Sequence, residues 1–135
     1  MKKILLATSI ALGLACVSFK VLDDQPKKPW IVPDKFSSMK NPVASNSESV
    51  ADGKELWGTH CKSCHGNKGL GDGPKAAQLK TDPRDFSKAD EQSQPDGSMF
   101  YRISEGRDDM PSFKKKMPEA NDVWDVVNFV RTLKK

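Results

Sequence analysis

The sequence predicts a small all-α domain preceded by an extended N-terminal tether. Apolar residues recur at helical spacing in segments 97–105 and 118–135, and a third helical pattern begins near Ser49. No stretch has the alternating pattern of a good strand. We expect three parts along the chain, a leader, a proline-rich linker and a domain, at residues 1–22, 23–48 and 49–135.

The leader has the layout of a Sec-type export signal, because two lysines follow Met1 and Ile4 to Phe19 carry no charge. It predicts a periplasmic protein, or one on the extracytoplasmic face of the membrane. Three fates remain open: removal, lipidation of Cys16 behind Gly13-Leu14-Ala15, which resembles a lipoprotein cleavage box, or retention as an uncut helix. An uncut helix from Ile4 to Leu22 has about 19 residues at about 1.5 Å each, which barely reaches the ~30 Å of a bilayer core.

The linker is expected to be extended because four prolines oppose a helix there. Within it, Trp30-Ile31-Val32 is expected to dock on the domain or on a partner subunit. Residues 1–48 hold seven Lys and four acidic residues, whereas residues 49–135 hold 15 Lys plus Arg and 14 Asp plus Glu. The domain is therefore almost neutral, and its charge gives no argument for nucleic-acid binding.

The first helix of the domain is expected to begin near Ser49, with Ser49 or Asp52 as its N-cap. Gly53, Trp57 and Cys61 recur four apart and therefore share one face of this helix.

The hexapeptide Cys61-Lys62-Ser63-Cys64-His65-Gly66 is the attachment signature of a c-type haem. Two thiols at this spacing suit the two haem vinyl groups, and His65 directly after them can aim an imidazole nitrogen at the iron. A dithiol redox motif needs a thioredoxin-like alternation of strands and helices, and a zinc site needs four well-spread ligands. Because the other thiol and imidazole are Cys16 and His60, in the leader and beside Cys61, the hexapeptide favours one covalent haem c over zinc.

Residues 66–74 contain four glycines and end in Pro74. Gly66 is expected to end the helix, and the run lacks the Gly-Lys-Ser/Thr ending of a phosphate-binding loop. We interpret it as a haem-side loop in which a carbonyl near Pro74 accepts a hydrogen bond from His65. A short helical turn is expected at Ala76–Leu79.

Two further helices are expected. Asp96 is the predicted N-cap of a helix over residues 97–105, and Gly106 its end. The last helix is expected to start at residues 118–121 and to run to the end of the chain. Its apolar face is formed by Val123, Trp124, Val126, Val127, Phe129, Val130 and Leu133.

A haem iron bound by one His has a sixth position, and the group that fills it decides the chemistry. His60 cannot fill it, because it lies on the helix that delivers His65. Met110 is favoured because it lies in a loop between two helices, and Pro111 holds the residue before it extended. Met117, and an open position or another ligand such as Lys, are the alternatives.

Residues 49–135 resemble the class I monohaem c-type cytochrome family. The resemblance is carried by Gly53, Trp57, Cys61, Cys64, His65, Gly73-Pro74, Met110-Pro111 and Trp124 with residues 129–133. It implies a small cytochrome c fold, with three to four helices wrapped around one covalently attached haem. It also implies His65 and Met110 as axial ligands. Arg107-Asp108-Asp109 departs from the family, where smaller or glycine-rich sequence is common at this place.

The resemblance implies extracytoplasmic electron transfer, either by a carrier or by a subunit of a membrane-associated respiratory complex, and no enzyme activity of its own. Membrane-bound redox proteins are the expected partners. Lys114-Lys115-Lys116 either steers an acidic partner or is an ordinary solvated loop. The rival functions are a haem enzyme or gas sensor with an open sixth position, and a non-redox zinc module.

Overall fold

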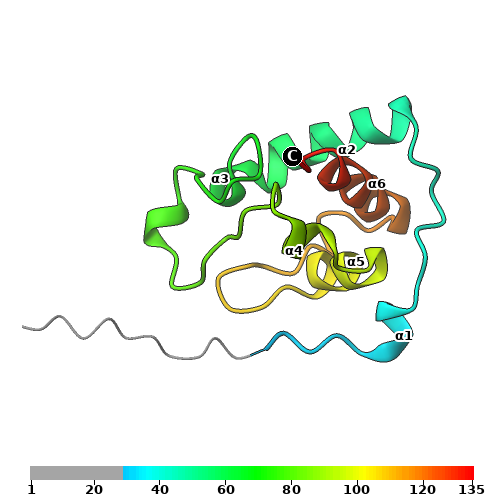
Figure 1. Cartoon of the computed structure of the whole chain (residues 1–135), viewed down its shortest axis with the longest axis horizontal. Coiled ribbons are helices and arrows are strands. Elements are labelled where there is room, and N and C mark those ends of the chain that lie inside the picture. Colours follow the sequence, from blue (N-terminus) through cyan, green and yellow to red (C-terminus); the bar gives the residue numbers. More distant parts are fainter. Residues whose placement is uncertain (1–28) are drawn as a thin grey trace, which may run out of the picture.

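The computed structural model describes residues 29–135 (Figure 1). The predictions about the leader and Cys16 therefore lie outside the described residues. The described part is helical and contains no strand, which confirms the all-α prediction. Its helices are α1 (Asp34–Ser37), α2 (Ser47–His60), α3 (Lys62–His65), the 3₁₀ turn η1 (Ala76–Gln78), α4 (Ala89–Gln92), α5 (Asp96–Glu105) and α6 (Ala120–Arg131). Within residues 29–135 no helix has both the length and the apolar character needed to cross a membrane.

The crossing of α2 and α6 forms the centre of the domain (Figure 1). Gly53 lies at this crossing, where an added Cβ would be only 2.0 Å from the carbonyl oxygen of Asp125. One turn further along α2, the ring of Trp57 packs 5.6 Å from that of Phe129. The buried apolar side chains around this crossing are Trp57, Cys61, Met99, Ile103, Phe113, Met117, Val123, Trp124, Val126, Val127, Phe129 and Val130.

The start of α2 differs from the prediction. Asn46 is the N-cap, and its side-chain oxygen accepts a hydrogen bond from the backbone N–H of Ser49 at 2.9 Å. Ser49 and Asp52 lie inside the helix, and the Ser49 hydroxyl donates to Asp125 at 2.5 Å. The prediction of Ser49 or Asp52 as the cap was therefore wrong, because Ser49 is used in the contact with α6.

The prediction for α5 was correct in its extent and at its C-terminus, where Gly106 ends the helix with a φ of 68°. The predicted capping role of Asp96 was wrong. Asp96 is the first helical residue, and its carboxylate accepts a hydrogen bond from Arg131 at 2.5 Å. This ion pair ties the beginning of α5 to the end of α6.

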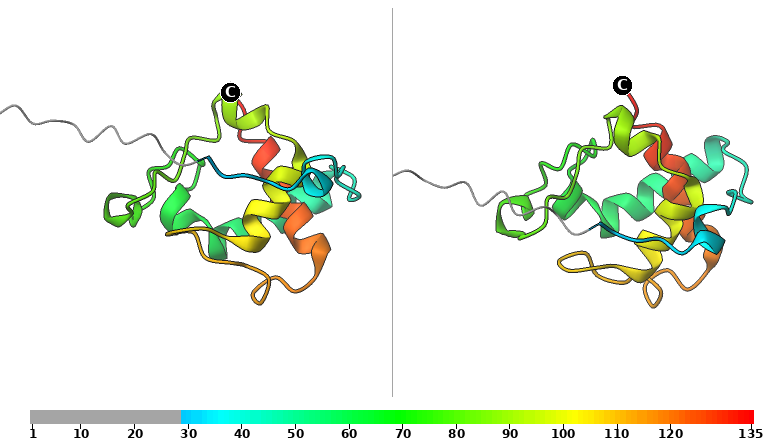
Figure 2. Two further views of the ribbon diagram at one scale, coloured as in Figure 1. Left: turned by 90° about the horizontal axis from the view of Figure 1, so that it is seen from below. Right: turned by 60° about the horizontal axis from the view of Figure 1, so that its bottom comes forward.

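Residues 29–46, which we call the strap, are not a free tether: the first part, up to α1, lies along α5, and the rest passes α6 on its way to α2 (Figure 2). The strap is extended in part, as predicted, but residues 34–37 form the single-turn helix α1. The ring of Phe36 lies 4.8 Å from that of Tyr101. A Cβ on Gly97 would be 1.9 Å from the carbonyl oxygen of Phe36, so the strap backbone lies directly on α5.

Both ends of the strap contact the domain. The Trp30 ring faces the guanidinium groups of Arg102 and Arg107, whose carbons lie 5.7 and 4.8 Å from its centroid. Trp30 thus docks on the domain as predicted, although its neighbour Ile31 is 80% exposed. Toward the other end, the Asn41 side chain donates to a backbone carbonyl of α6 at 3.2 Å.

Candidate functional site

The two predicted attachment cysteines lie where α2 meets α3. Cys61 is the junction residue and is buried, whereas Cys64 lies one turn later and is half-buried. Both are free thiols. Burial, together with a smaller effect of the neighbouring Cys64, raises the pKa of the Cys61 thiol to about 12. Cys61 therefore lies as a protonated thiol in the apolar core, and Cys64 lies one turn further along at a more exposed position.

The His65 side chain is held in one orientation. Its Nδ1 lies 2.6 Å from the carbonyl oxygen of Pro83, and because a carbonyl can only accept, Nδ1 carries the proton. The rings of Trp57 and Phe86 lie 5.5 and 5.3 Å from the imidazole. Burial lowers the pKa of His65, and the carbonyl of Pro83 opposes this shift. The neutral ring therefore has Nε2 available as a metal ligand.

The carbonyl that supports His65 was predicted near Pro74, and that prediction was wrong. The structure uses Pro83, which lies 18 residues after His65. The glycine loop has a different role, since the backbone N–H groups of Gly71 and Gly73 donate to the carbonyls of His65 and Cys64 at 2.9 and 3.2 Å. It thereby satisfies the carbonyls at the end of α3 that have no helical partner.

Gly66 ends α3 as predicted, with a φ of 82°. Its carbonyl oxygen accepts a hydrogen bond from the indole Nε1 of Trp57 at 3.0 Å. A Cβ on Gly73 would lie 2.6 Å from the carbonyl oxygens of Ser63 and Cys64. The loop therefore wraps closely around the attachment helix, and glycine is needed for this approach.

Met110 lies in the loop after α5, as predicted. Its backbone is paired with that of Arg107 by two hydrogen bonds, of 2.8 and 2.9 Å, and its half-buried side chain packs against the core. Met117 and Met99 are enclosed core residues, 2% and 5% exposed, whereas Met39 lies on the strap and is 36% exposed. His60 stays on α2, with its ring 5.9 Å from that of Phe113.

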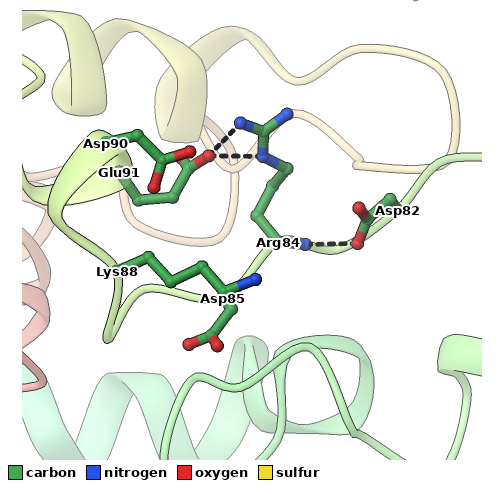
Figure 3. A pocket seen from close by; sticks show the side chains of 6 residues that line it. All are labelled: Asp82, Arg84, Asp85, Lys88, Asp90 and Glu91. Carbon is green, nitrogen blue, oxygen red and sulfur yellow. Dashed lines mark hydrogen bonds and ion pairs between the residues drawn. The ribbon is translucent and has the colours of Figure 1, made fainter.

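An ion pair that the sequence did not reveal lies beside the Pro83 segment. Glu91 is buried, and its carboxylate accepts hydrogen bonds from Arg84 and, at 2.5 Å, from Gln94. Figure 3 shows the Arg84 guanidinium reaching Glu91 across an open polar pocket. Arg84 has a φ of 65°, which is uncommon for a residue with a side chain. Because the pairing depends on where α4 lies, no local sequence signal predicted it.

Arg102 is a second charged residue that the sequence did not single out. Its Nε is buried and has no hydrogen-bond partner among residues 29–135. Burial lowers the pKa of Arg102, Glu91 opposes this, and the charges of Arg84 and Arg107 lower the pKa further. The charges of Glu91, Arg84 and Arg107 all act on Arg102, and its Nε is left as a donor that could serve another anionic group.

The donor set fits a c-type haem. Cys61 and Cys64 supply thiols for its vinyl groups, and His65 supplies a neutral imidazole with Nε2 available. The unpaired N–H of Arg102 suits a propionate carboxylate. For the zinc alternative, the part of the chain that the structure describes holds no group of three His, Cys, Asp or Glu side chains placed to bind a metal ion.

Comparison with known proteins also supports a c-type haem site. The sequence model of a family described as Cytochrome c matches residues 50–134. A search of curated proteins found no match.

Two solved structures are similar to this chain. One is described as the "Kuenenia stuttgartiensis reducing HAO-like protein complex Kustc0457/Kustc0458", with a TM-score of 0.64 and 23% identity over 82% of this chain. The match spans only 53% of that structure's chain, so the likeness concerns the fold of about half of it. The other, "KustC0563 c-type cytochrome", has a TM-score of 0.55 and 34% identity, over 62% of this chain and 99% of its own.

Proposed function

Because this chain belongs to the cytochrome c family, we propose that it transfers electrons outside the cytoplasm through one covalently bound haem c with His/Met ligation. The observation that supports this most directly is a pair of cysteines in no disulfide, followed by an imidazole whose Nδ1 is engaged by Pro83. Cys61 and Cys64 would form the thioether links, and His65 Nε2 would bind the iron. When bound, the haem supplies a one-electron iron couple.

Met110 is the proposed sixth ligand. Its loop position and half-buried side chain support this role, whereas Met117 and Met99 are enclosed in the core. A thioether ligand favours the reduced iron and raises the potential. With His65 and Met110 both bound to the iron, no position would remain for a substrate, which separates this proposal from a haem enzyme or gas sensor.

The proposed partners are redox proteins, held at or near a membrane. The export-signal pattern of residues 1–22 supports an extracytoplasmic location, and Cys16 lipidation or an uncut helix are the two proposed means of attachment. One similar structure belongs to a multi-protein complex, which supports a subunit role alongside that of a free carrier.

Spectroscopy of the natively exported protein tests this function. We expect the mass of one haem added to the polypeptide, a c-type pyridine haemochrome spectrum, and a weak Met-to-iron absorption at the red end of the oxidised spectrum. The variant Met110→Leu should lose this absorption while keeping the haem. Met117→Leu, the matched control for a methionine in the core, should retain it.

Each failure has a different meaning. No added haem mass would refute the proposed function altogether. Loss of the absorption in Met117→Leu, but not in Met110→Leu, would move the sixth ligand to Met117. A wild-type protein that carries haem but lacks this absorption would favour the enzyme or gas-sensor reading.

A further inference from the structure

The carboxylate of Asp109 joins two loops that lie far apart in the sequence. One oxygen, Oδ2, accepts hydrogen bonds from the backbone N–H groups of Lys80 and Thr81, at 2.7 and 2.8 Å. The two segments, residues 79–83 in green and residues 106–111 in yellow-orange, can be followed in Figure 1. A carboxylate acceptor makes these hydrogen bonds stronger than those between neutral groups.

Each segment leads directly to a candidate axial ligand. Thr81 is two residues before Pro83, whose carbonyl orients the His65 ring. Asp109 immediately precedes Met110, in a turn closed by two backbone hydrogen bonds to Arg107. The Asp109 carboxylate therefore bridges the segment that supports one ligand and the loop that carries the other.

The rest of the Met110 loop is fixed mainly to α5. Ser112 donates to the carbonyl of Ser104 at 2.6 Å, and Lys114 pairs with Glu105 at 2.5 Å. These contacts hold the end of the loop that follows Met110. On the side that precedes Met110, the side chain of Asp109 makes the connection to the Pro83 segment.

We propose that Asp109 is a positioning residue that holds the Met110 loop against the His65-supporting segment, so that the two axial ligands stay in place together. This inference rests on the proposed function, because it requires Met110 to bind the iron. Asp109 lies in the stretch where the sequence departs from the family pattern.

The test compares Asp109→Ala and Asp109→Asn with the control Asp108→Asn in the haem-loaded protein. Asp108 is the adjacent carboxylate, 61% exposed, and it pairs with Arg107 within its own loop. Asparagine also tolerates the φ of 53° at this position. Two quantities are measured: amide hydrogen exchange at Lys80 and Thr81 in the reduced protein, and the affinity of the oxidised protein for added imidazole, which competes with Met110.

We expect Asp109→Ala to raise both the exchange rate of the two amides and the apparent imidazole affinity by about tenfold, because two charge-assisted hydrogen bonds are lost. Asp109→Asn should give a smaller change, since an amide oxygen still accepts hydrogen bonds but carries no charge. Asp108→Asn should match the wild type in both measurements.

Two results overturn the positioning role while leaving the proposed function intact. One is unchanged amide exchange in Asp109→Ala. The other is faster exchange with unchanged imidazole affinity, which makes the bridge a local loop contact. If Met110→Leu retains the Met-to-iron absorption, the ligand assignment fails, and this inference fails with it. That measurement needs no Asp109 variant, so the two kinds of failure can be told apart.

Discussion

Replacing Gly53 with alanine tests the helix crossing that places the attachment hexapeptide. The new Cβ would be 2.0 Å from the carbonyl oxygen of Asp125 and 3.0 Å from Cβ of Phe129. Real Cβ atoms essentially never come within 3.0 Å of such an atom, so α2 and α6 must separate by about 1 Å (3.0 − 2.0). The obstacle is backbone, which has no alternative rotamer.

The size of the effect follows from two opposing contributions. Overpacking of this kind costs about 1–3 kcal/mol, and the overlap with backbone places Gly53→Ala at the upper end. Alanine regains about 1 kcal/mol of helix propensity. We therefore expect the free energy of unfolding to fall by about 2 kcal/mol, which for a domain of this size lowers Tm by roughly 8–16 °C.

Gly58→Ala is the matched control on the same helix. A Cβ at Gly58 meets nothing within 4 Å, so the substitution should raise the free energy of unfolding by up to about 1 kcal/mol. Both variants are measured in the haem-loaded protein by thermal and urea unfolding followed by far-ultraviolet circular dichroism. If Gly53→Ala is as stable as Gly58→Ala, the close α2–α6 crossing is refuted.

Two further predictions concern attachment to the membrane and the docking of a redox partner. Cys16→Ser should release the protein from membranes if lipid is the anchor, as judged by fractionation, and continued retention would favour an uncut helix or a bound partner. Replacing Lys114 to Lys116 with glutamine should slow electron transfer to an acidic partner several-fold at low ionic strength and have little effect at high salt. Lys114 is already paired with Glu105, so Lys115 and Lys116 should account for most of the change. An unaltered rate at low salt would show that these three lysines are ordinary surface residues with no role in steering.

Much of the fold was predictable because its long helices carry local signals. The glycine at the end of α5 and the apolar face of α6 up to Val130 are read from neighbouring residues, and both were correct. The prediction that the last helix runs to the end of the chain was wrong, because α6 ends at Arg131 and Leu133 lies beyond it. The N-cap residues were harder to predict, because several polar residues near the start of a helix can each serve as the cap. Asn46 took the cap of α2, while Ser49 and Asp96 were used in contacts with α6.

For the candidate site, the sequence by itself determined the group that can be attached. The two thiols and the imidazole lie within one helical turn, so their relative placement depends only on local backbone geometry. The tertiary structure decided what surrounds them: which carbonyl orients His65, which guanidinium is left with a free Nε donor, and how Asp109 reaches Lys80 and Thr81. These contacts join residues 18 or more positions apart or depend on several loops at once, and no local spacing specifies how loops of that kind meet.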